Sequence, residues 1–301
     1  MNRSRASQPG KWLKRARQAA YVVLHAPDHV RCALAVKRSS LKGRQRASSK
    51  YLGDCFALSL TTAQRRHALV QHHWASSQTF PRAIASEISK GVTLWQRDTP
   101  NEAPLVLALE PAAIAPMEGE LQLKFSYRSY LHVLTFLFAP GHLFGSDCRT
   151  VIFIGGVQGR VGCREEIRAA AKLNREIAPA AVLLLAAQAL AEELETELLA
   201  VGEADQISMS YSPSMVRFDY EAFWTEMGGS RGARFYRLPL HSPQRPLSSI
   251  GLSHRARTRR KREEKSRIRA EIAASFRKLV TAASDVQPDV VSPEARETLI
   301  H

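Results

Sequence analysis

The alternation of hydrophobic and polar residues is most regular in the middle of the chain. Between Glu118 and Tyr127 apolar and polar residues alternate, which predicts a half-buried strand. Residues 131–138 are apolar on both faces, as expected of a central strand. A short turn at Arg128–Tyr130 would join these two strands into an antiparallel hairpin. The same criteria predict further strands at residues 104–110, 150–154, 198–201 and 235–240.

Helical spacing accounts for most of the remaining chain. Residues 51–95 have a mostly helical pattern, in which Thr61 or Thr62 is placed to cap a helix. Gly228 and Gly229 fit a left-handed cap at the end of a helix over 218–227. Other helices are predicted at 164–176, 180–196 and 254–279. This order of elements predicts an α/β (α+β) fold, with helices that flank a central mixed, largely antiparallel sheet.

The first 27 residues contain a basic amphipathic pattern. Apolar residues recur near helical spacing at Trp12, Leu13, Ala16, Ala20, Val23 and Leu24. On the other side lie the basic residues Lys11, Lys14, Arg15 and Arg17. Two interpretations stay open: a helix that binds a membrane surface or an acidic partner, and a helix that packs on the core with a solvated basic face.

The predicted helix over 254–279 has two unlike halves. Its second half contains an apolar stripe that we expect to dock on the core, formed by Ile268, Ile272, Phe276 and Leu279. Its first half contains a basic cluster suited to anionic membranes or acidic proteins, formed by Arg255, Arg257, Arg259, Arg260, Lys261 and Arg262. Nucleic acid is a minor alternative, because no nucleic-acid-binding motif accompanies the cluster.

The net charge of +15 belongs to the two ends of the chain. Residues 1–50 contain 13 Lys and Arg against one acidic residue, and residues 251–280 contain 11 against 3. Residues 51–250 are close to neutral, with 18 basic and 20 acidic residues. The predicted division is a basic, partly flexible N-terminal segment (1–50), an α/β domain (51–250), a basic C-terminal helix (251–281) and a disordered tail (282–301).

Composition also disfavours membrane-spanning and secreted proteins. The most apolar stretch, Ala180–Ala191, is about half as long as the ~20 residues that span a bilayer, and no secretory signal is visible. Cysteines do not form CxxC pairs, and we expect reduced thiols at Cys32, Cys55, Cys148 and Cys163. These features predict a cytoplasmic protein.

The histidines and cysteines form no recognisable reactive site. His67, His72 and His73 lie close in the sequence, but their spacing suits no standard zinc site, so we predict structural histidines and no metal. No GxSxG motif is present, and Cys148 and Cys163 have no identifiable histidine partner. Nucleophilic catalysis is therefore disfavoured.

The strand at 150–154 is expected to end in a glycine-rich loop before a helix. Glycines in such a loop let backbone amides approach an anion at the helix N-terminus, so the 155–164 loop could hold a phosphate group of a cofactor. The candidate cofactor-binding residues are Gly155, Gly156, Gln158, Gly159 and Arg160. A purely structural turn is an equal alternative.

The order of elements resembles the fold of the GNAT acetyltransferases. The segment YEAFWTEMGGSRGARFYRLPL is similar to the usual end of that fold, where an aromatic helix passes through glycine into a final strand. The resemblance implies an acyltransferase with an acyl-CoA or acyl-carrier donor, whose general base would be Glu118, Glu120 or Glu226. The chain departs from the GNAT loop pattern at Val161, where a glycine is needed.

Several segments together resemble the bacterial VirK/YbjX family over about residues 50–275. The most specific are GGVQG (155–159) and YEAFWTEMGG (220–229), joined in order by LTTAQRRHALVQHHW, MEGELQLKF, YLHVLTFLF and HRARTRRKREE. The resemblance implies a role in virulence, envelope stress or surface-protein display in Gram-negative bacteria, with no established reaction. Lys172, in the further matching segment IRAAAKLN (167–174), joins the candidate cofactor-binding residues by its position, and Tyr220 and Trp224 are further candidates.

Two functions are therefore predicted. The first is a cytoplasmic accessory factor, peripheral to the inner membrane, that meets an anionic membrane or an acidic partner through its basic ends. The alternative is a GNAT-like acyltransferase that holds its donor at the 155–164 loop.

Overall fold

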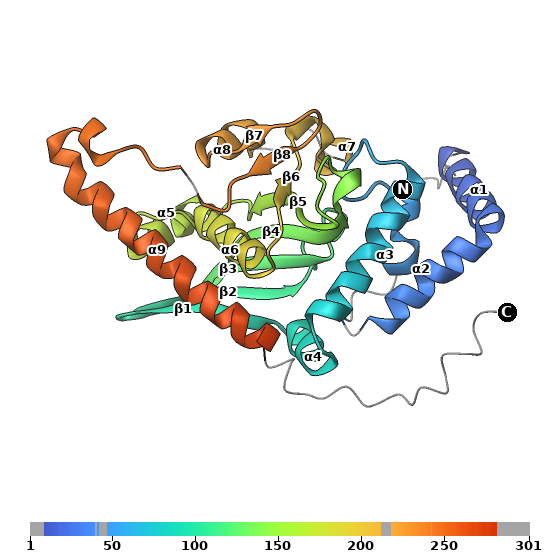
Figure 1. Cartoon of the computed structure of the whole chain (residues 1–301), viewed down its shortest axis with the longest axis horizontal. Coiled ribbons are helices and arrows are strands. Elements are labelled where there is room, and N and C mark those ends of the chain that lie inside the picture. Colours follow the sequence, from blue (N-terminus) through green and yellow to red (C-terminus); the bar gives the residue numbers. More distant parts are fainter. Residues whose placement is uncertain (1–8, 40, 42–46, 212–217, 242, 282–301) are drawn as a thin grey trace, which may run out of the picture.

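A mixed sheet forms the centre of the computed structural model, and helices cover it (Figure 1). The structure describes residues 9–39, 41, 47–211, 218–241 and 243–281. Within these residues the sheet has eight strands in the order β1-β2-β3-β4-β5-β6-β8-β7. Neighbouring strands are antiparallel, except that β5 and β6 run parallel. The predicted fold class is confirmed.

The strands are β1 (Val92–Thr99), β2 (Glu102–Pro111), β3 (Leu121–Tyr127), β4 (Ser129–Pro140), β5 (Thr150–Gly159), β6 (Leu198–Ala200), β7 (Ser230–Arg231) and β8 (Tyr236–Leu238). The predicted hairpin is the pair β3–β4. It reverses at Arg128, whose φ of 60° gives the left-handed conformation that so tight a turn requires.

The helices are α1 (Pro9–Leu24), α2 (Ala26–Arg38), α3 (Thr62–Thr79), α4 (Arg82–Lys90), α5 (Arg164–Leu173), α6 (Pro179–Glu193), α7 (Ser208–Tyr211), α8 (Tyr220–Glu226) and α9 (Leu252–Thr281). Short 3₁₀ turns are η1 (Ala47–Leu52), η2 (Gly141–Leu143), η3 (Glu203–Asp205) and η5 (Leu247–Ser249). Helix α6 lies across β3, β4 and β5, α9 packs on α6 and β1, and α3 packs on β4 (Figure 1).

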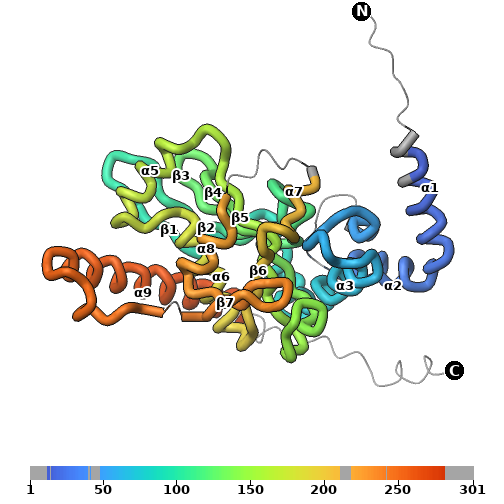
Figure 2. Tube along the Cα trace, turned by 90° about the horizontal axis from the view of Figure 1, so that it is seen from above, coloured from blue at the N-terminus to red at the C-terminus, as the bar shows by residue number. Residues whose placement is uncertain are grey.

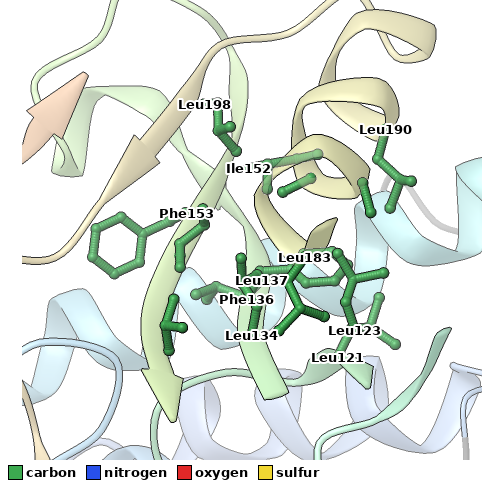
Figure 3. Packing of buried hydrophobic residues seen from close by; sticks show 14 of the residues in the cluster. Leu121, Leu123, Leu134, Phe136, Leu137, Ile152, Phe153, Leu183, Leu190 and Leu198 are labelled. Carbon is green, nitrogen blue, oxygen red and sulfur yellow. The ribbon is translucent and has the colours of Figure 1, made fainter. Parts of the chain in front are cut away.

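Helix α6 is apolar nearly all round because it lies between the sheet and α9. Its side chains meet Leu and Phe side chains of β3, β4 and β5, and Leu183 and Leu190 are among those drawn in Figure 3. Each fully buried Leu or Phe contributes about 1.5–3 kcal/mol relative to exposure. The most apolar stretch of the chain, Ala180–Ala191, is therefore part of the central core helix α6.

The expected docking of the second half of α9 is confirmed. Ile268, Ile272 and Phe276 are fully buried, and the Phe276 ring meets Phe80 edge to face with centroids 6.1 Å apart. Leu279 is half-buried and packs against the same core. The first half of α9 extends beyond the sheet (Figure 1).

Two local predictions need correction. The mostly helical pattern of residues 51–95 is confirmed by α3 and α4, but its last residues belong to the edge strand β1, whose apolar residues are too few to give a clear period-two pattern. Strand β5 does not end at Ile154 but continues to Gly159, and α5 begins only at Arg164. The glycines predicted to form a loop are therefore inside a strand. The helix predicted at Thr61 or Thr62 is confirmed by a capping box between Thr61 and Gln64.

The two basic ends of the chain lie far apart. Figures 1 and 2 both place α1 at one end of the molecule and the first half of α9 at the other. Buried residues of both ends share one hydrophobic core with the middle of the chain, among them Cys32 of α2 and Ile268 of α9. The predicted domain boundaries stay predictions, and the predicted tail 282–301 lies outside the described residues.

Candidate functional site

A bulge in β5 brings a carboxylate against the strand. The pairing of β4 with β5 shifts register between Thr135 and Phe136, which leaves Gly155 as an extra residue in β5. A Cβ atom on Gly155 would lie 1.8 Å from the Glu118 carbonyl oxygen, and one on Gly156 would lie 1.9 Å from Glu118 Oε2. Glycine at both positions therefore admits the segment that carries Glu118.

The Glu118 carboxylate is buried and bound by uncharged groups. Its Oε1 accepts hydrogen bonds from Gln158 Nε2 at 2.5 Å and Gln206 Nε2 at 2.6 Å, and its Oε2 accepts one from Thr135 Oγ1 at 3.3 Å. Burial raises the pKa of Glu118 to about 7, against the opposing effect of these hydrogen bonds and of the Lys50 charge. The Glu118 carboxyl group therefore changes from its protonated to its charged form near pH 7.

Tyr220 completes this group of residues, which we call the Glu118 cluster: Glu118, Thr135, Gln158, Gln206 and Tyr220. The Tyr220 hydroxyl accepts from the Val157 amide at 3.1 Å, donates to the Val157 carbonyl at 3.0 Å and accepts from Gln206 at 3.0 Å. Strand β6 pairs with β5 only at residues 152–154, so Tyr220 replaces a strand partner at Val157. Burial raises the pKa of Tyr220 above its ordinary value, which keeps the hydroxyl neutral.

Helix α8 fixes the position of Tyr220. Asp219 caps the helix by accepting a hydrogen bond from the Ala222 amide at 2.8 Å. One turn later Trp224, fully buried, donates from Nε1 to the Val201 carbonyl at 2.8 Å. Tyr220 and Trp224, candidates by position in the motifs, thus attach α8 to the place where β5 and β6 part.

The other candidate cofactor-binding residues are dispersed. Gly159 is exposed, and a Cβ there would lie 2.9 Å from the His132 ring. Arg160 binds Ser129 Oγ and lies over the Tyr130 ring, 5.7 Å from its centroid. Lys172 is exposed on α5. The structure therefore groups Gly155, Gly156 and Gln158 with Glu118 and leaves these three residues outside that group.

The other two candidate general bases, Glu120 and Glu226, lie outside the cluster. Glu120 forms an ion pair with Lys50 at 2.5 Å, and both side chains are about nine-tenths buried. Glu226 is exposed at the end of α8. Glu118 is the candidate base that combines near-complete burial with a pKa of about 7. Thr135 and Gln206 were missed, because Thr135 is a polar residue within the apolar segment YLHVLTFLF and Gln206 lies outside the quoted segments.

The predicted basic cluster of α9 divides into two sets. Arg257, Lys261 and Arg262 line a groove of about 450 Å³, together with His254, Thr258 and Lys265. We call this the basic groove. Arg255 instead donates to the Ile250 carbonyl at 2.8 Å, and Arg259 and Arg260 are exposed outside the groove lining.

Helix α1 turns its apolar side to solvent. The side chains of Trp12, Val23 and Leu24 are 71%, 75% and 78% exposed. The side that faces the rest of the molecule carries Gln18, which donates to the Leu52 carbonyl at 2.9 Å, and Tyr21, whose ring meets Tyr51 edge to face. The interpretation of α1 as a helix that packs its apolar side on the core is therefore wrong.

Two of the three α3 histidines, His72 and His73, are part of the core, and His67 is exposed. His72 is buried, its Nδ1 accepts from the Phe138 amide at 3.2 Å, and its ring lies parallel to the Phe138 ring. Burial lowers the pKa of both His72 and His73, so both are neutral at pH 7. Among the described residues, three or more potential metal ligands do not converge anywhere. In the same part of the chain, none of the helices has the length and apolar character needed to cross a membrane.

Comparisons with known proteins agree with the sequence resemblance. The family model described as "Protein of unknown function (DUF535)" matches residues 14–274. An uncharacterized protein of Escherichia coli (strain K12), YbjX, is 32% identical over 137 residues. That match covers 43% of this chain and 42% of the relative, so it spans less than half of either protein. No solved structure matches. The chain therefore belongs to the DUF535 family, as the resemblance to VirK/YbjX proteins predicted.

Proposed function

We propose that the protein is a cytoplasmic accessory factor that binds anionic membrane surfaces peripherally through α1. The observation that carries the proposal is the outward-facing apolar side of α1. An envelope or surface-protein role, as implied by the VirK/YbjX resemblance, would place its partner at the inner membrane. The following paragraphs give the support for membrane binding.

The exposed apolar residues of α1 form one continuous face. At 3.6 residues per turn, Trp12, Leu13, Val23 and Leu24 fall within about one third of the helix circumference. All four are more than half exposed. Exposed apolar residues scattered singly are normal, but a contiguous face with a Trp is typical of helices that lie in the membrane interface.

Charge favours an anionic surface. The first 50 residues contain 13 Lys and Arg against one acidic residue. Arg15, Arg17 and Arg31 are exposed beside the apolar face of α1 and on α2. Each Lys or Arg close to an anionic leaflet contributes about 1 kcal/mol to binding. Insertion of the apolar face and attraction of the basic residues would therefore act together, as two weak signals do in stable peripheral binding.

Replacing the apolar face should release the protein from vesicles. We expect Trp12→Ser, Leu13→Ser, Val23→Ser and Leu24→Ser, combined, to weaken binding by about tenfold or more, because each buried apolar side chain contributes on the order of 1 kcal/mol. The measurement is co-sedimentation with vesicles of phosphatidylcholine containing about one quarter phosphatidylglycerol.

The matched control changes exposed apolar residues elsewhere. Val161 and Leu252 are 81% and 80% exposed and lie outside α1. Val161→Ser with Leu252→Ser should leave vesicle binding unchanged. Equal loss in both variants, or full binding by the α1 variant, would contradict the proposal.

An acyltransferase is the second candidate function, and the Glu118 cluster favours it. A general base that takes a proton from an amine works best when its pKa lies near the working pH. Glu118 has such a pKa, and it lies where β5 and β6 part. Gln158 is the half-exposed member of the cluster, so an acceptor amine would meet the cluster there. An acyl donor that used the β5 edge would have to displace Tyr220 from Val157.

The variant Glu118→Gln tests whether the pKa of Glu118 is raised. The folded-state pKa of Glu118 is raised from 4.5 to about 7, so its contribution to stability is complete below about pH 4.5 and is lost as pH rises through 7. Since glutamine does not titrate, the stability of Glu118→Gln relative to the parent should rise by about 2–3 kcal/mol as pH rises from about 5 to about 8.5. Urea unfolding at the two pH values measures this difference, with the exposed Glu226→Gln as control.

The acyltransferase candidate also predicts donor binding and acyl transfer. Acetyl-CoA should raise the melting temperature of both the parent and Glu118→Gln, while acyl transfer to an amine should be lost only in Glu118→Gln. Absence of any thermal shift with CoA or acetyl-CoA would remove this candidate. It would leave the membrane proposal intact, because α1 takes no part in the cluster.

A further inference from the structure

The basic groove is a continuous stripe along the first half of α9. Its lining residues are His254, Arg257, Thr258, Lys261, Arg262 and Lys265. They recur every three or four positions, so they lie on one side of the helix over about 16 Å. Figures 1 and 2 place this half of α9 at the end of the molecule opposite α1. The groove is therefore a separate surface from the proposed membrane-binding face.

Positive charge in the groove exceeds the negative charge that reaches it. Four of the six lining residues are Lys or Arg. On the negative side, Glu176 lies 3.8 Å from Arg257, and the charge of Glu226 acts on Lys265. Burial lowers the pKa of Lys265, the charge of Lys261 lowers it further, and Glu226 opposes both. A bound anion would relieve this repulsion between like charges.

The helix that carries the groove is held firmly. Arg262 donates to the Arg245 carbonyl, which ties the chain before α9 to the helix. Next to Lys265 in the sequence, buried Glu264 accepts a hydrogen bond from Arg97 of β1 and pairs with Arg175 of the α5–α6 connection. The lining side chains therefore start from a fixed backbone, which lowers the entropic cost of binding.

We propose that the basic groove binds a small molecule or headgroup that carries two neighbouring phosphate groups. A volume of about 450 Å³ suits a small ligand, and a stripe of about 16 Å is longer than one phosphate can contact. Arg binds phosphate through paired N–H groups and Lys binds it as a point charge, and the groove presents both. The hydroxyl group of Thr258, another lining residue, adds an uncharged donor.

The test measures binding of inorganic pyrophosphate to the full chain by titration calorimetry at about 150 mM NaCl, where unspecific attraction is screened. The groove variant is Arg257→Glu with Lys261→Glu. The matched control is Arg259→Glu with Arg260→Glu, which makes the same change of charge on the same helix outside the groove lining. Circular dichroism checks that both variants fold, and Arg257→Gln with Lys261→Gln replaces the groove variant if it does not.

We expect the groove variant to bind pyrophosphate at least about tenfold more weakly than the control, because charge-assisted hydrogen bonds are lost only in the groove. Geranyl diphosphate, titrated in parallel, identifies the source: tighter binding than pyrophosphate assigns the groove to a lipid-linked diphosphate, and equal binding assigns it to a free one. Equal weakening in groove variant and control, or no binding of either probe at millimolar concentration, would overturn the proposal. No vesicle is used, so the result is independent of α1.

Discussion

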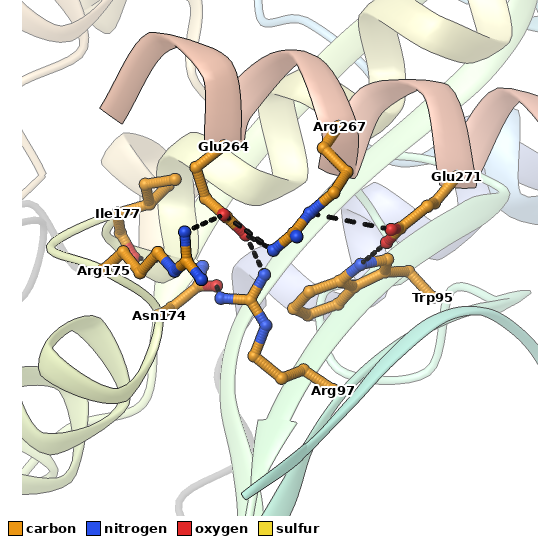
Figure 4. Close-up of polar contacts among 8 residues, drawn as sticks. All are labelled: Trp95, Arg97, Asn174, Arg175, Ile177, Glu264, Arg267 and Glu271. Atoms are coloured by element: carbon orange, nitrogen blue, oxygen red, sulfur yellow. Dashed lines mark hydrogen bonds and ion pairs between the residues drawn. The ribbon is translucent and has the colours of Figure 1, made fainter. Parts of the chain in front are cut away.

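Replacing Glu264 by alanine should lower the free energy of unfolding by about 3–5 kcal/mol, the cost of breaking a buried ion pair. Glu264 is 2% exposed in the middle of α9. Its carboxylate accepts hydrogen bonds from Arg267 at 2.7 Å and from Arg97, and Arg175 lies 3.1 Å away (Figure 4). Alanine would leave Arg97, which is also largely buried, without its carboxylate.

The charge state of Glu264 decides the pH dependence of this effect. Burial alone would raise its pKa, but hydrogen bonds from Arg267 and Arg97 and the charge of Arg175 hold the pKa below its ordinary value. The stabilisation is therefore present above about pH 4.5 and is lost as pH falls through the lower, folded-state pKa. The penalty of Glu264→Ala should thus be full at pH 7 and shrink in acid.

Chemical denaturation measures the effect, and the neighbouring Glu263→Ala is the control. Glu263 is exposed, so its replacement should change stability by no more than about 0.5 kcal/mol. Equal effects of the two variants would show that the ion pairs of Glu264 do not stabilise the position of α9.

Gly155→Ala should cost about 3 kcal/mol or prevent folding, at the upper end of what overpacking costs. The new Cβ would lie 1.8 Å from the Glu118 carbonyl oxygen. Both atoms belong to segments that are hydrogen-bonded to β4. Strand β5 pairs with β4 directly. The segment that contains Glu118 is held by the hydrogen bond from the Glu120 amide to the Phe136 carbonyl. Neither can move without breaking sheet hydrogen bonds.

Gly251→Ala is the matched control, because its Cβ would meet only His254 at an ordinary 3.9 Å. Thermal unfolding of both variants gives the comparison, with a fall of about 5–10 °C or more expected for Gly155→Ala alone. A small effect at Gly155 would mean that the Glu118 segment is loosely placed and that the cluster is not preorganised.

The sequence predicted the centre of the sheet well and its edges poorly. Strands β3 and β4 follow clear patterns because one face of β3 and both faces of β4 are buried. Strand β1 lies at the sheet edge, where partial exposure weakens the alternation. Glycines usually interrupt strands, so Gly155 and Gly156 suggested a loop. In the structure they continue β5, because the space above them belongs to Glu118.

The candidate site was only partly predictable, because the sequence shows its motifs but not which of them meet in the fold. Glu118, Gln158 and Tyr220 stand in motifs that drew attention, but nothing local shows that they meet, since residues 118 and 220 approach only through the order of the sheet. Gln206 joins them from an irregular segment after η3. The amphipathic pattern of α1 was visible, whereas the direction of its apolar face depends on contacts of Gln18 and Tyr21 with η1, about thirty residues away.

The fluorescence of Trp12 tests the central claim most directly. Trp12 is one of four tryptophans, and Trp12→Phe keeps an apolar side chain, so the difference between the two spectra isolates its emission. On addition of phosphatidylglycerol vesicles, we predict that this emission moves to shorter wavelength and is quenched by lipids brominated in their acyl chains. An unchanged difference spectrum under conditions where the protein sediments with the vesicles would contradict insertion of α1.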